Sequence, residues 1–176
     1  IITLSRGRTE FDFERFTGRR RSALRGDNAN RSIADDKPVS AIPLYQDIEI
    51  VSPEFLESTL PIASLQRVQS YYRVNENRRV AYLNEQREVE ATEASNLDEL
   101  ADRIAHTGSG GGFLSNEISY RTHWLREQLG VTLAVGHLHL PKPDLSPDGR
   151  ASNDPQSAQA MIVAQVKEVV RAALDS

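Results

Sequence analysis

The clearest hydrophobic pattern in the chain is an alternation of apolar and polar residues over positions 10–16. Phe11 and Phe13 fall on one side of this pattern, and Glu14 falls on the other with the remaining acidic residues. Successive side chains of a strand point to opposite faces of a sheet. The alternation therefore predicts a half-buried strand whose phenylalanine face packs against apolar neighbours.

Other segments add strands and helices in turn. Short apolar runs predict strands at 1–4, 45–51 and 131–140, with a turn at 5–9 after the first of them. Capping residues and helical spacing predict helices that start at Ser52 and Ser58 and that cover 96–104, 115–130 and 157–174. Strands that alternate with helices indicate an α/β layer fold with a largely parallel sheet.

Length, composition and charge limit the classes of function. The 176 residues suit one domain, 1–176. The net charge of −4 argues against a general nucleic-acid binder, and we interpret the arginines at 19–21 as a solvated face. We expect no membrane span, because no apolar run approaches the required length. The absence of cysteine removes disulfides, thiolate zinc sites and a cysteine nucleophile.

The chain opens on Ile1-Ile2-Thr3-Leu4, which resembles the inside of a strand. We expect that an upstream N-terminal segment exists and acts as a partner of this chain, because a sheet without its first strand exposes an open edge. We expect a cytoplasmic location, and the sequence leaves homo-oligomerisation open.

Ser115 follows a glycine-rich loop at 107–112 and opens a predicted helix. Backbone N–H groups at a helix start hold an oxyanion or another anion well, so Ser115 is a candidate nucleophile. The plain alternative is a serine that only caps the helix. The loop is not a Walker loop, because no Gly-Lys-Ser/Thr follows it.

His137 and His139 lie two apart on a predicted strand and so project to the same side. Either one is a candidate general base, and Glu14 is a candidate carboxylate that orients it. A solvated strand residue is the alternative for Glu14. A His-x-His pair also suits a metal, but no third ligand with convincing spacing is present, so we expect no metal site. We interpret His106 and His123 as surface or boundary residues.

Four segments in order resemble the pyroglutamyl peptidase I family, also called the pyrrolidone-carboxylate peptidases. The stretch 4–15 is similar to that family's Gly-Leu-Ala-x-Gly-Arg-Ser … Glu-Arg segment, and 58–62 is similar to its Ser-Thr-Leu-Pro helix start. Positions 112–116 resemble Gly-Thr-Tyr/Phe-Val-Cys-Asn, and 136–141 resemble Gly-Phe-Ile-His-Ile-Pro. Order and rough spacing hold over most of the chain.

The resemblance implies a three-layer α/β/α sandwich and the removal of an N-terminal pyroglutamyl group from a blocked peptide, without a cofactor. It implies Glu14, Ser115 and His139 as catalytic positions, and Phe113 and Leu114 as residues that line the pocket for the pyroglutamyl ring. Ser115 stands where the family has its nucleophilic cysteine. The family's first strand and its phenylalanine-bearing loop are missing before Ile1, and 66–110 contains an insertion of roughly 25 residues, long for a compact domain.

These departures leave several functions open. A pyroglutamyl peptidase-like hydrolase is the first hypothesis. Its activity depends on whether the Ser115 hydroxyl can act as the nucleophile in place of the family's thiol. A catalytically dead relative that binds or regulates a partner through its insertion is the second. A module that binds an anion or nucleotide at the glycine loop is the third.

Overall fold

A four-stranded sheet forms the centre of the molecule in the computed structural model, which describes residues 1–22, 39–42, 52–68, 70–150 and 153–176. Its strand order is β1-β11-β2-β7, made of β1 (Ile2–Arg8), β11 (Gly136–Pro141), β2 (Phe11–Glu14) and β7 (Val74–Asn77). Two of its three pairings, β1 with β11 and β2 with β7, are parallel, and β11 with β2 is antiparallel. The largely parallel sheet is confirmed.

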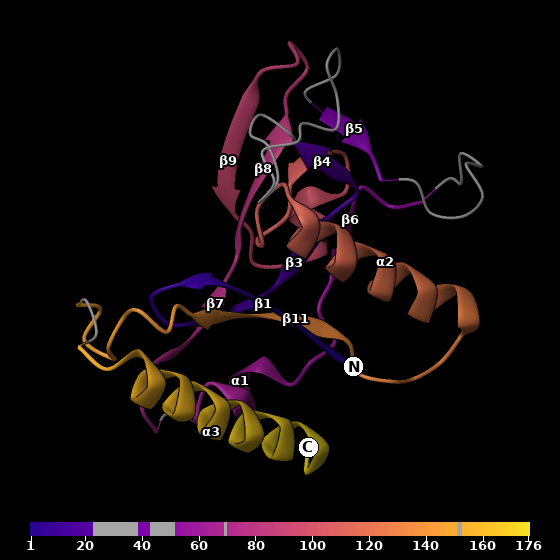
Figure 1. Ribbon diagram of the computed structural model, residues 1–176. Helices are drawn as coiled ribbons and strands as arrows, with labels where there is room; N and C mark the ends of the chain where they lie inside the picture. Colours follow the sequence, from indigo (N-terminus) through magenta and orange to yellow (C-terminus); the bar gives the residue numbers. More distant parts are fainter. Residues whose placement is uncertain (23–38, 43–51, 69, 151–152) are drawn as a thin grey trace.

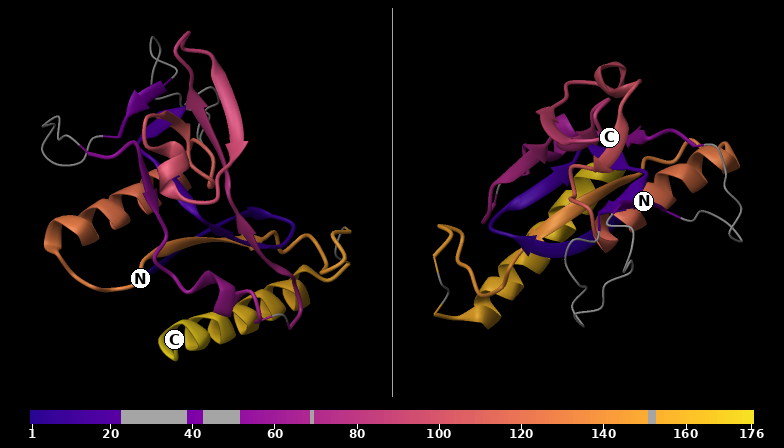
Figure 2. Two further views of the ribbon diagram at one scale, coloured as in Figure 1. Left: turned by 180° about the vertical axis from the view of Figure 1, so that it is seen from behind. Right: turned by 90° about the horizontal axis from the view of Figure 1, so that it is seen from above.

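Helices cover both faces of this sheet (Figure 1). On one face lie α1 (Ile62–Leu65) and α3 (Pro155–Leu174), and on the other lies α2 (Leu114–Leu129). The view from behind in Figure 2 shows the same three layers. Phe11, Phe13 and Leu138 are almost fully buried between the sheet and the α1–α3 layer, with Ile162 and Val169 of α3 packed on them. The α/β/α sandwich and the phenylalanine face of β2 are both confirmed.

Smaller sheets continue the fold beyond the central one. β3 (Phe16–Gly18) pairs with β6 (Phe55–Glu57), and β4 (Arg20–Ser22) pairs with β5 (Val39–Ala41). A three-stranded sheet has the order β10-β8-β9, made of β10 (Ile104–Thr107), β8 (Arg79–Leu83) and β9 (Val89–Glu93). A short 3₁₀ helix, η1 (Leu97–Leu100), precedes β10. β3, β6, β8, β10 and η1 contribute to a second core that includes Phe16, Phe55 and Val80.

Local signals fixed several boundaries correctly. Gly130 ends α2 in the left-handed conformation, with φ of 60°, as its position predicts. Asn96 accepts a hydrogen bond from the Glu99 N–H, and the Glu99 carboxylate accepts one from the Ser95 N–H. This capping arrangement was expected, although it holds one 3₁₀ turn and Ile104 already belongs to β10.

Other predictions were wrong. No helix starts at Ser52, because 55–57 pairs with β3 as a strand, and the helix predicted from Ser58 is the single turn α1. The predicted turn at 5–9 is instead the second half of β1, which pairs with β11 up to Arg8. The strand predicted at 131–140 begins only at Gly136. The strand predicted at 45–51 lies outside the described residues.

The Asn116 side chain joins the start of α2 to the β3–β4 segment. Its Oδ1 accepts from the Gly18 N–H at 2.8 Å, and its Nδ2 donates to the Gly18 carbonyl at 2.8 Å and to the Arg20 carbonyl at 3.1 Å. Asn116 is only 1% exposed, so these bonds satisfy a buried amide. Gly108 packs closely against this amide, since a Cβ placed on it would lie 2.3 Å from Asn116 Oδ1 and 2.6 Å from the Gly18 nitrogen.

We predict that Gly108→Ala lowers the free energy of unfolding by about 1–3 kcal/mol, because the added methyl displaces the buried amide of Asn116. Gly110→Ala is the matched control. Its Cβ would meet its nearest neighbours at 3.5–3.8 Å, which is ordinary contact, so we expect a smaller loss. Urea unfolding of both variants measures the difference, and equal losses would contradict the role of the Asn116 contact.

Candidate functional site

Glu14 and His139 form a buried pair between neighbouring strands. His139 Nδ1 lies 2.5 Å from Glu14 Oε1, and the two residues are 6% and 3% exposed. In the β11–β2 register His137 stands opposite Glu14 and His139 stands opposite Asp12, so the pair is a diagonal one across the ladder. With the carboxylate ionised, Nδ1–H donates to it and Nε2 remains the basic nitrogen of the ring.

Two neighbours complete the surroundings of this pair. A guanidinium nitrogen of Arg8 lies 3.5 Å from Glu14 Oε1, and its Nε lies 3.5 Å from Asp12 Oδ2. Gly110 covers the pair, since a Cβ on it would lie 3.5 Å from His139 Cε1 and 3.6 Å from Glu14 Cγ. The second oxygen of Glu14, Oε2, is buried without a hydrogen-bond partner among the described residues.

Ser115 is the second residue of α2, after Phe113 at the N-cap position. Its hydroxyl donates to the Gly110 carbonyl at 3.2 Å, and Gly110 in turn lies against His139. The first N–H groups of an α-helix have no hydrogen-bond partner within the helix. Gly110 lies close to these groups in α2, because a Cβ on it would be 3.8 Å from the Asn116 nitrogen. The structure therefore gathers Ser115, the start of the helix and the Glu14–His139 pair around Gly110.

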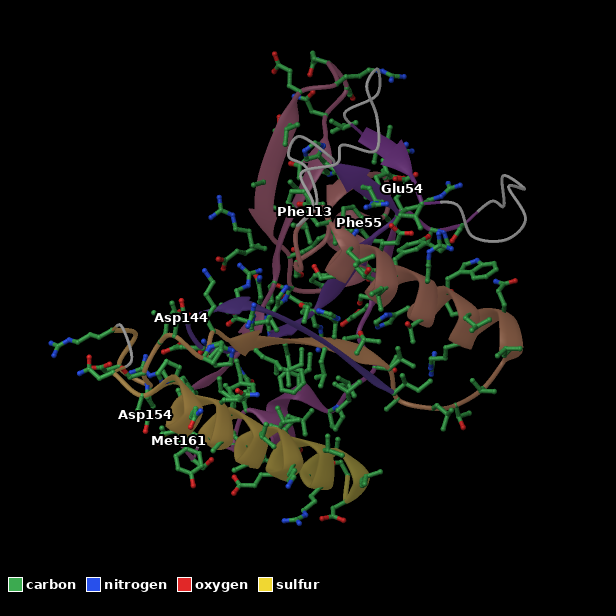
Figure 3. All side chains as sticks on the ribbon, viewed as in Figure 1. Glu54, Phe55, Phe113, Asp144, Asp154 and Met161 are labelled. Carbon is green, nitrogen blue, oxygen red and sulfur yellow. The ribbon has the colours of Figure 1, made fainter. Side chains whose placement is uncertain are left out.

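A groove of about 790 Å³ brings the sequence-predicted site residues other than Glu14 to one surface. Ser115 and His139 line it together with Phe113, Leu114 and His137. Phe113 and Leu114 are 41% and 58% exposed, so they offer apolar surface at the groove. Figure 3 shows Phe113 above the central sheet and Asp144, another lining residue, on the loop after β11. Glu14 lies behind His139 and not on the groove wall.

His137 faces the same side of β11 as His139, as the strand pattern predicts, but it has different partners. Its Nδ1 lies 2.8 Å from Thr3 Oγ1 and its Nε2 lies 2.8 Å from Ser5 Oγ. The two imidazole rings meet edge to face with centroids 4.9 Å apart. Burial, with smaller contributions from His139, His123 and Arg8, lowers the pKa of His137 to about 3. His137 is thus a neutral, hydrogen-bonded neighbour of His139.

The sequence suggests that the other two histidines are surface or boundary residues, but the structure buries both. His106 is 8% exposed and His123 is 3% exposed, and burial lowers the pKa of each. His123 Nδ1 lies 2.8 Å from the Ser119 carbonyl. Periodicity could not show this burial, because a single polar residue does not change an amphipathic pattern. Among the described residues, no group of three or more His, Asp or Glu side chains is arranged to hold a metal ion.

The arginines at 19–21 are paired with acids, which corrects the solvated face expected from the sequence. Arg20 makes two hydrogen bonds to Glu54, and Arg21 forms an ion pair with Glu117. Glu54 also accepts a hydrogen bond from the Ala105 N–H. These charges hold β4 against β6, β10 and α2. No helix in the described part of the chain combines the length and apolar character needed to cross a membrane.

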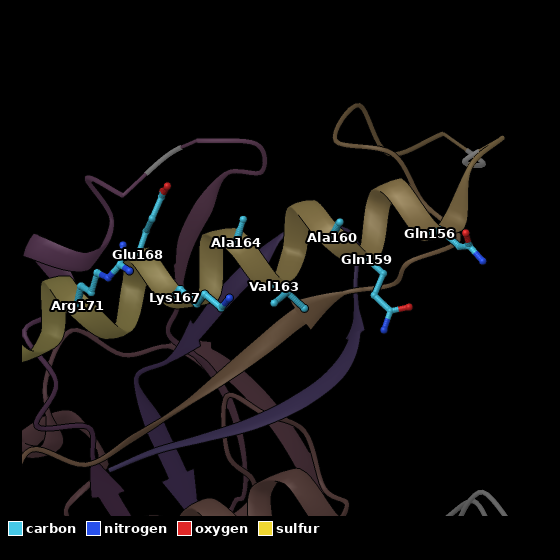
Figure 4. Close-up of a pocket in the computed structure, with 8 residues that line it drawn as sticks. All are labelled: Gln156, Gln159, Ala160, Val163, Ala164, Lys167, Glu168 and Arg171. Atoms are coloured by element: carbon cyan, nitrogen blue, oxygen red, sulfur yellow. The ribbon is translucent and has the colours of Figure 1, made fainter.

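A second hollow, of about 540 Å³, runs along the outer face of α3 (Figure 4). It contains glutamines, small apolar residues and the charged Lys167, Glu168 and Arg171. It shares no lining residue with the groove at His139 and offers no histidine or serine. The groove at His139 is therefore the better candidate for chemistry.

Three residues near the site were missed as functional positions from the sequence. Arg8 contacts Glu14, Gly110 covers the pair, and Asn116 anchors the helix that carries Ser115. Only Asn116 left a signal, because an asparagine inside the first turn of a helix is poorly placed for a cap and needs another partner.

Comparisons with known proteins are consistent with this fold. A family model described as the PA0049 C-terminal domain matches residues 69–144, less than half of the chain. The crystal structure of Pf-PCP(1-204)-C matches with a TM-score of 0.56 at 18% identity, over 99% of this chain and 65% of that one. Pyrrolidone carboxyl peptidase from the hyperthermophile Pyrococcus furiosus matches at 0.57 and 17%, over 99% and 67%. A mutant of it matches at 0.56 and 20%, over 99% and 67%.

These likenesses show the fold. The chain spans 65% to 67% of the length of the solved structures named above. No curated protein sequence matches it.

We predict that stability falls as pH is lowered from about 7 to about 4. The pKa of His137 in the folded chain, about 3, lies below the ordinary histidine value of 6.5, so the unfolded chain binds more protons between these values. One such group gives a slope of up to about 1.4 kcal/mol per pH unit. The lowered pKa values of His106 and His123 act in the same direction.

Urea unfolding across this pH range measures the slope. His137→Gln removes one titrating group while keeping a polar side chain for Thr3 or Ser5, so it should flatten the profile. A slope unchanged by this substitution would contradict the burial of a neutral His137.

Proposed function

We propose that the chain is a hydrolase that transfers an acyl group, of the pyroglutamyl peptidase type, and that it removes pyroglutamate from a peptide N-terminus. The observation that carries this proposal is the buried Glu14–His139 contact of 2.5 Å behind a groove that Ser115 also lines. A histidine held by a carboxylate, beside a hydroxyl at a helix start, is the arrangement that acyl transfer requires.

Each residue has a defined task in this proposal. Glu14 accepts from Nδ1–H of His139 and keeps Nε2 free to take the proton of the Ser115 hydroxyl. The Ser115 oxygen then attacks the acyl carbon, the C–N bond to the following residue breaks, and His139 gives the proton it accepted to the amine that leaves. The N–H groups at the start of α2 stabilise the negative charge that develops on the acyl oxygen. Water releases the acyl group from Ser115 in the second half of the reaction, with His139 again as the base.

Phe113 and Leu114 provide the apolar surface for the pyroglutamyl ring. Both are exposed at the groove and directly precede Ser115. Moving a neutral lactam ring from water to such a surface costs much less free energy than moving a charged ammonium group. The proposed substrate is therefore a peptide whose N-terminus is blocked and uncharged.

Serine is the weaker nucleophile for this site. A hydroxyl loses its proton far less readily than a thiol, so the reaction depends fully on His139 as base. In the structure the Ser115 hydroxyl donates to the Gly110 carbonyl, and this bond has to break before the hydroxyl can give its proton to His139. We therefore expect slow turnover that a cysteine at this position increases.

The same hydrogen bond favours a second candidate function. A chain in which Ser115 stays bonded to Gly110 retains the groove and binds a blocked peptide without cleaving it. In this second candidate function, the sheet formed by β8, β9 and β10 provides additional binding surface.

Release of a fluorescent amine from a pyroglutamyl amide tests both candidates. For the hydrolase we expect measurable turnover, a loss of about 10²–10⁴-fold in His139→Ala and in Glu14→Gln, and a gain in Ser115→Cys. Ser157→Cys is the matched control, because Ser157 is an exposed serine of α3 outside the groove.

A Ser157→Cys chain as active as Ser115→Cys would mean that any thiol causes the gain. Absence of turnover in the native chain and in Ser115→Cys would overturn the hydrolase proposal. Binding of an intact pyroglutamyl peptide by that inactive chain, measured by calorimetry, would then support the second candidate.

A further inference from the structure

A hollow of about 300 Å³ lies on the other side of the glycine loop from the His139 groove. Gly108, Ser109 and Gly111 line it, while Gly110 between them lies against the Glu14–His139 pair. Arg8, which contacts Glu14, lines it as well. The hollow is therefore next to the proposed reaction centre but shares no lining residue with the groove.

The opposite wall comes from the β8–β9 hairpin, which follows directly after β7 (Figure 1). Side chains alternate across β8: Val80 and Tyr82 enter the second core, and Arg79 and Ala81 lie on the other face. Arg79 and Ala81 line the hollow, and Val80 also reaches it. Ala91, paired with Ala81 in the ladder, continues that wall. Two small residues leave space beside the Arg79 guanidinium.

Arg79 is an exposed charge at this place. Other arginines near the central sheet pair with acids, as Arg15 does with Glu57 and Glu76. Arg79 makes no ion pair within the described part of the chain, although Glu93 stands opposite it in the β8–β9 ladder. Its backbone is held by the Asn77 side chain, whose Oδ1 accepts from the Arg79 N–H at 3.1 Å.

Arg8 adds a second, partly compensated positive charge. Its guanidinium is shared between Asp12 and Glu14 at 3.5 Å each, which is long for a charged hydrogen bond. The hollow thus offers one unpaired guanidinium, one loosely held guanidinium and a wall of small apolar residues. Those features suit a carboxylate on a short aliphatic stem.

We propose that this hollow is a subsite for a carboxylate of the substrate on the far side of the scissile bond from the pyroglutamyl ring. The inference rests on the proposed function, because the position of the scissile bond follows from Ser115 and His139. Arg79 receives either the side chain of an acidic residue that follows pyroglutamate or the terminal carboxylate of a dipeptide. The hairpin within 66–110 thereby selects substrates.

Calorimetry with matched peptides tests the subsite in the native chain. Pyroglutamyl-glutamate amide should bind about fivefold more tightly than pyroglutamyl-glutamine amide, which has the same shape without the charge. The preference should weaken at high ionic strength. Arg79→Gln should abolish it, and Arg79→Lys should retain part of it.

Arg87→Gln is the control, because Arg87 is an exposed residue at the turn of the same hairpin and does not line the hollow. It removes the same charge at a greater distance. Loss of the preference in both variants would show a general charge effect and overturn the subsite. A second pair, pyroglutamyl-alanine and its amide, distinguishes a terminal carboxylate from an acidic side chain.

The subsite and the proposed function fail separately. N-acetyl-glutamate amide and N-acetyl-glutamine amide lack the pyroglutamyl ring, and shifts of the Arg79 Nε–H signal in NMR spectra report on their binding. A shift with the acid alone, without binding or turnover of pyroglutamyl peptides, would retain the subsite and reject the proposed function. Pyroglutamyl peptides that bind with no preference for acid would reject the subsite alone.

Discussion

The amide of Asn116 is the contact on which the arrangement of the molecule depends. It occupies the donor and the acceptor of Gly18 and reaches the Arg20 carbonyl, so it joins the start of α2 to the strands that follow β2. Ser115 directly precedes it, and Gly108 is pressed against it. A buried amide with all of its bonds made is rigid, because each lost bond leaves a desolvated group. The candidate nucleophile is therefore positioned by a neighbour that takes no part in the chemistry.

Much of the central sandwich could be predicted from the sequence, because its signals are local. The alternation around Phe11 and Phe13, the capping at Asn96 and the glycine at the end of α2 each depend on a few adjacent residues. The predicted helix at Ser52 failed for the opposite reason. Ser-Pro favours a helix start, but Phe55 and Leu56 gain more by burial against β3 and α2 than a short helix provides.

The candidate site divides in the same way. The residue types and order of Glu14, Ser115 and His139 are visible in the sequence, and two histidines on one strand must share a face. The two histidines differ in their hydrogen-bond partners. His139 contacts the Glu14 carboxylate, whereas His137 contacts the hydroxyls of Thr3 and Ser5. That difference arises from the pairing of β11 with β1 on one side and β2 on the other, a long-range fact that no local pattern contains.

The position of β11 between β1 and β2 also determines when the candidate site forms during folding. Glu14 and His139 are separated by 125 positions, and they meet only when a late strand has entered the space between two early ones. Contacts so distant along the chain form after local structure, because a large loop has to close first. A partly synthesised or partly folded chain therefore has a glutamate and a serine but no histidine beside them. The proposed site and the complete central sheet therefore form in a single event.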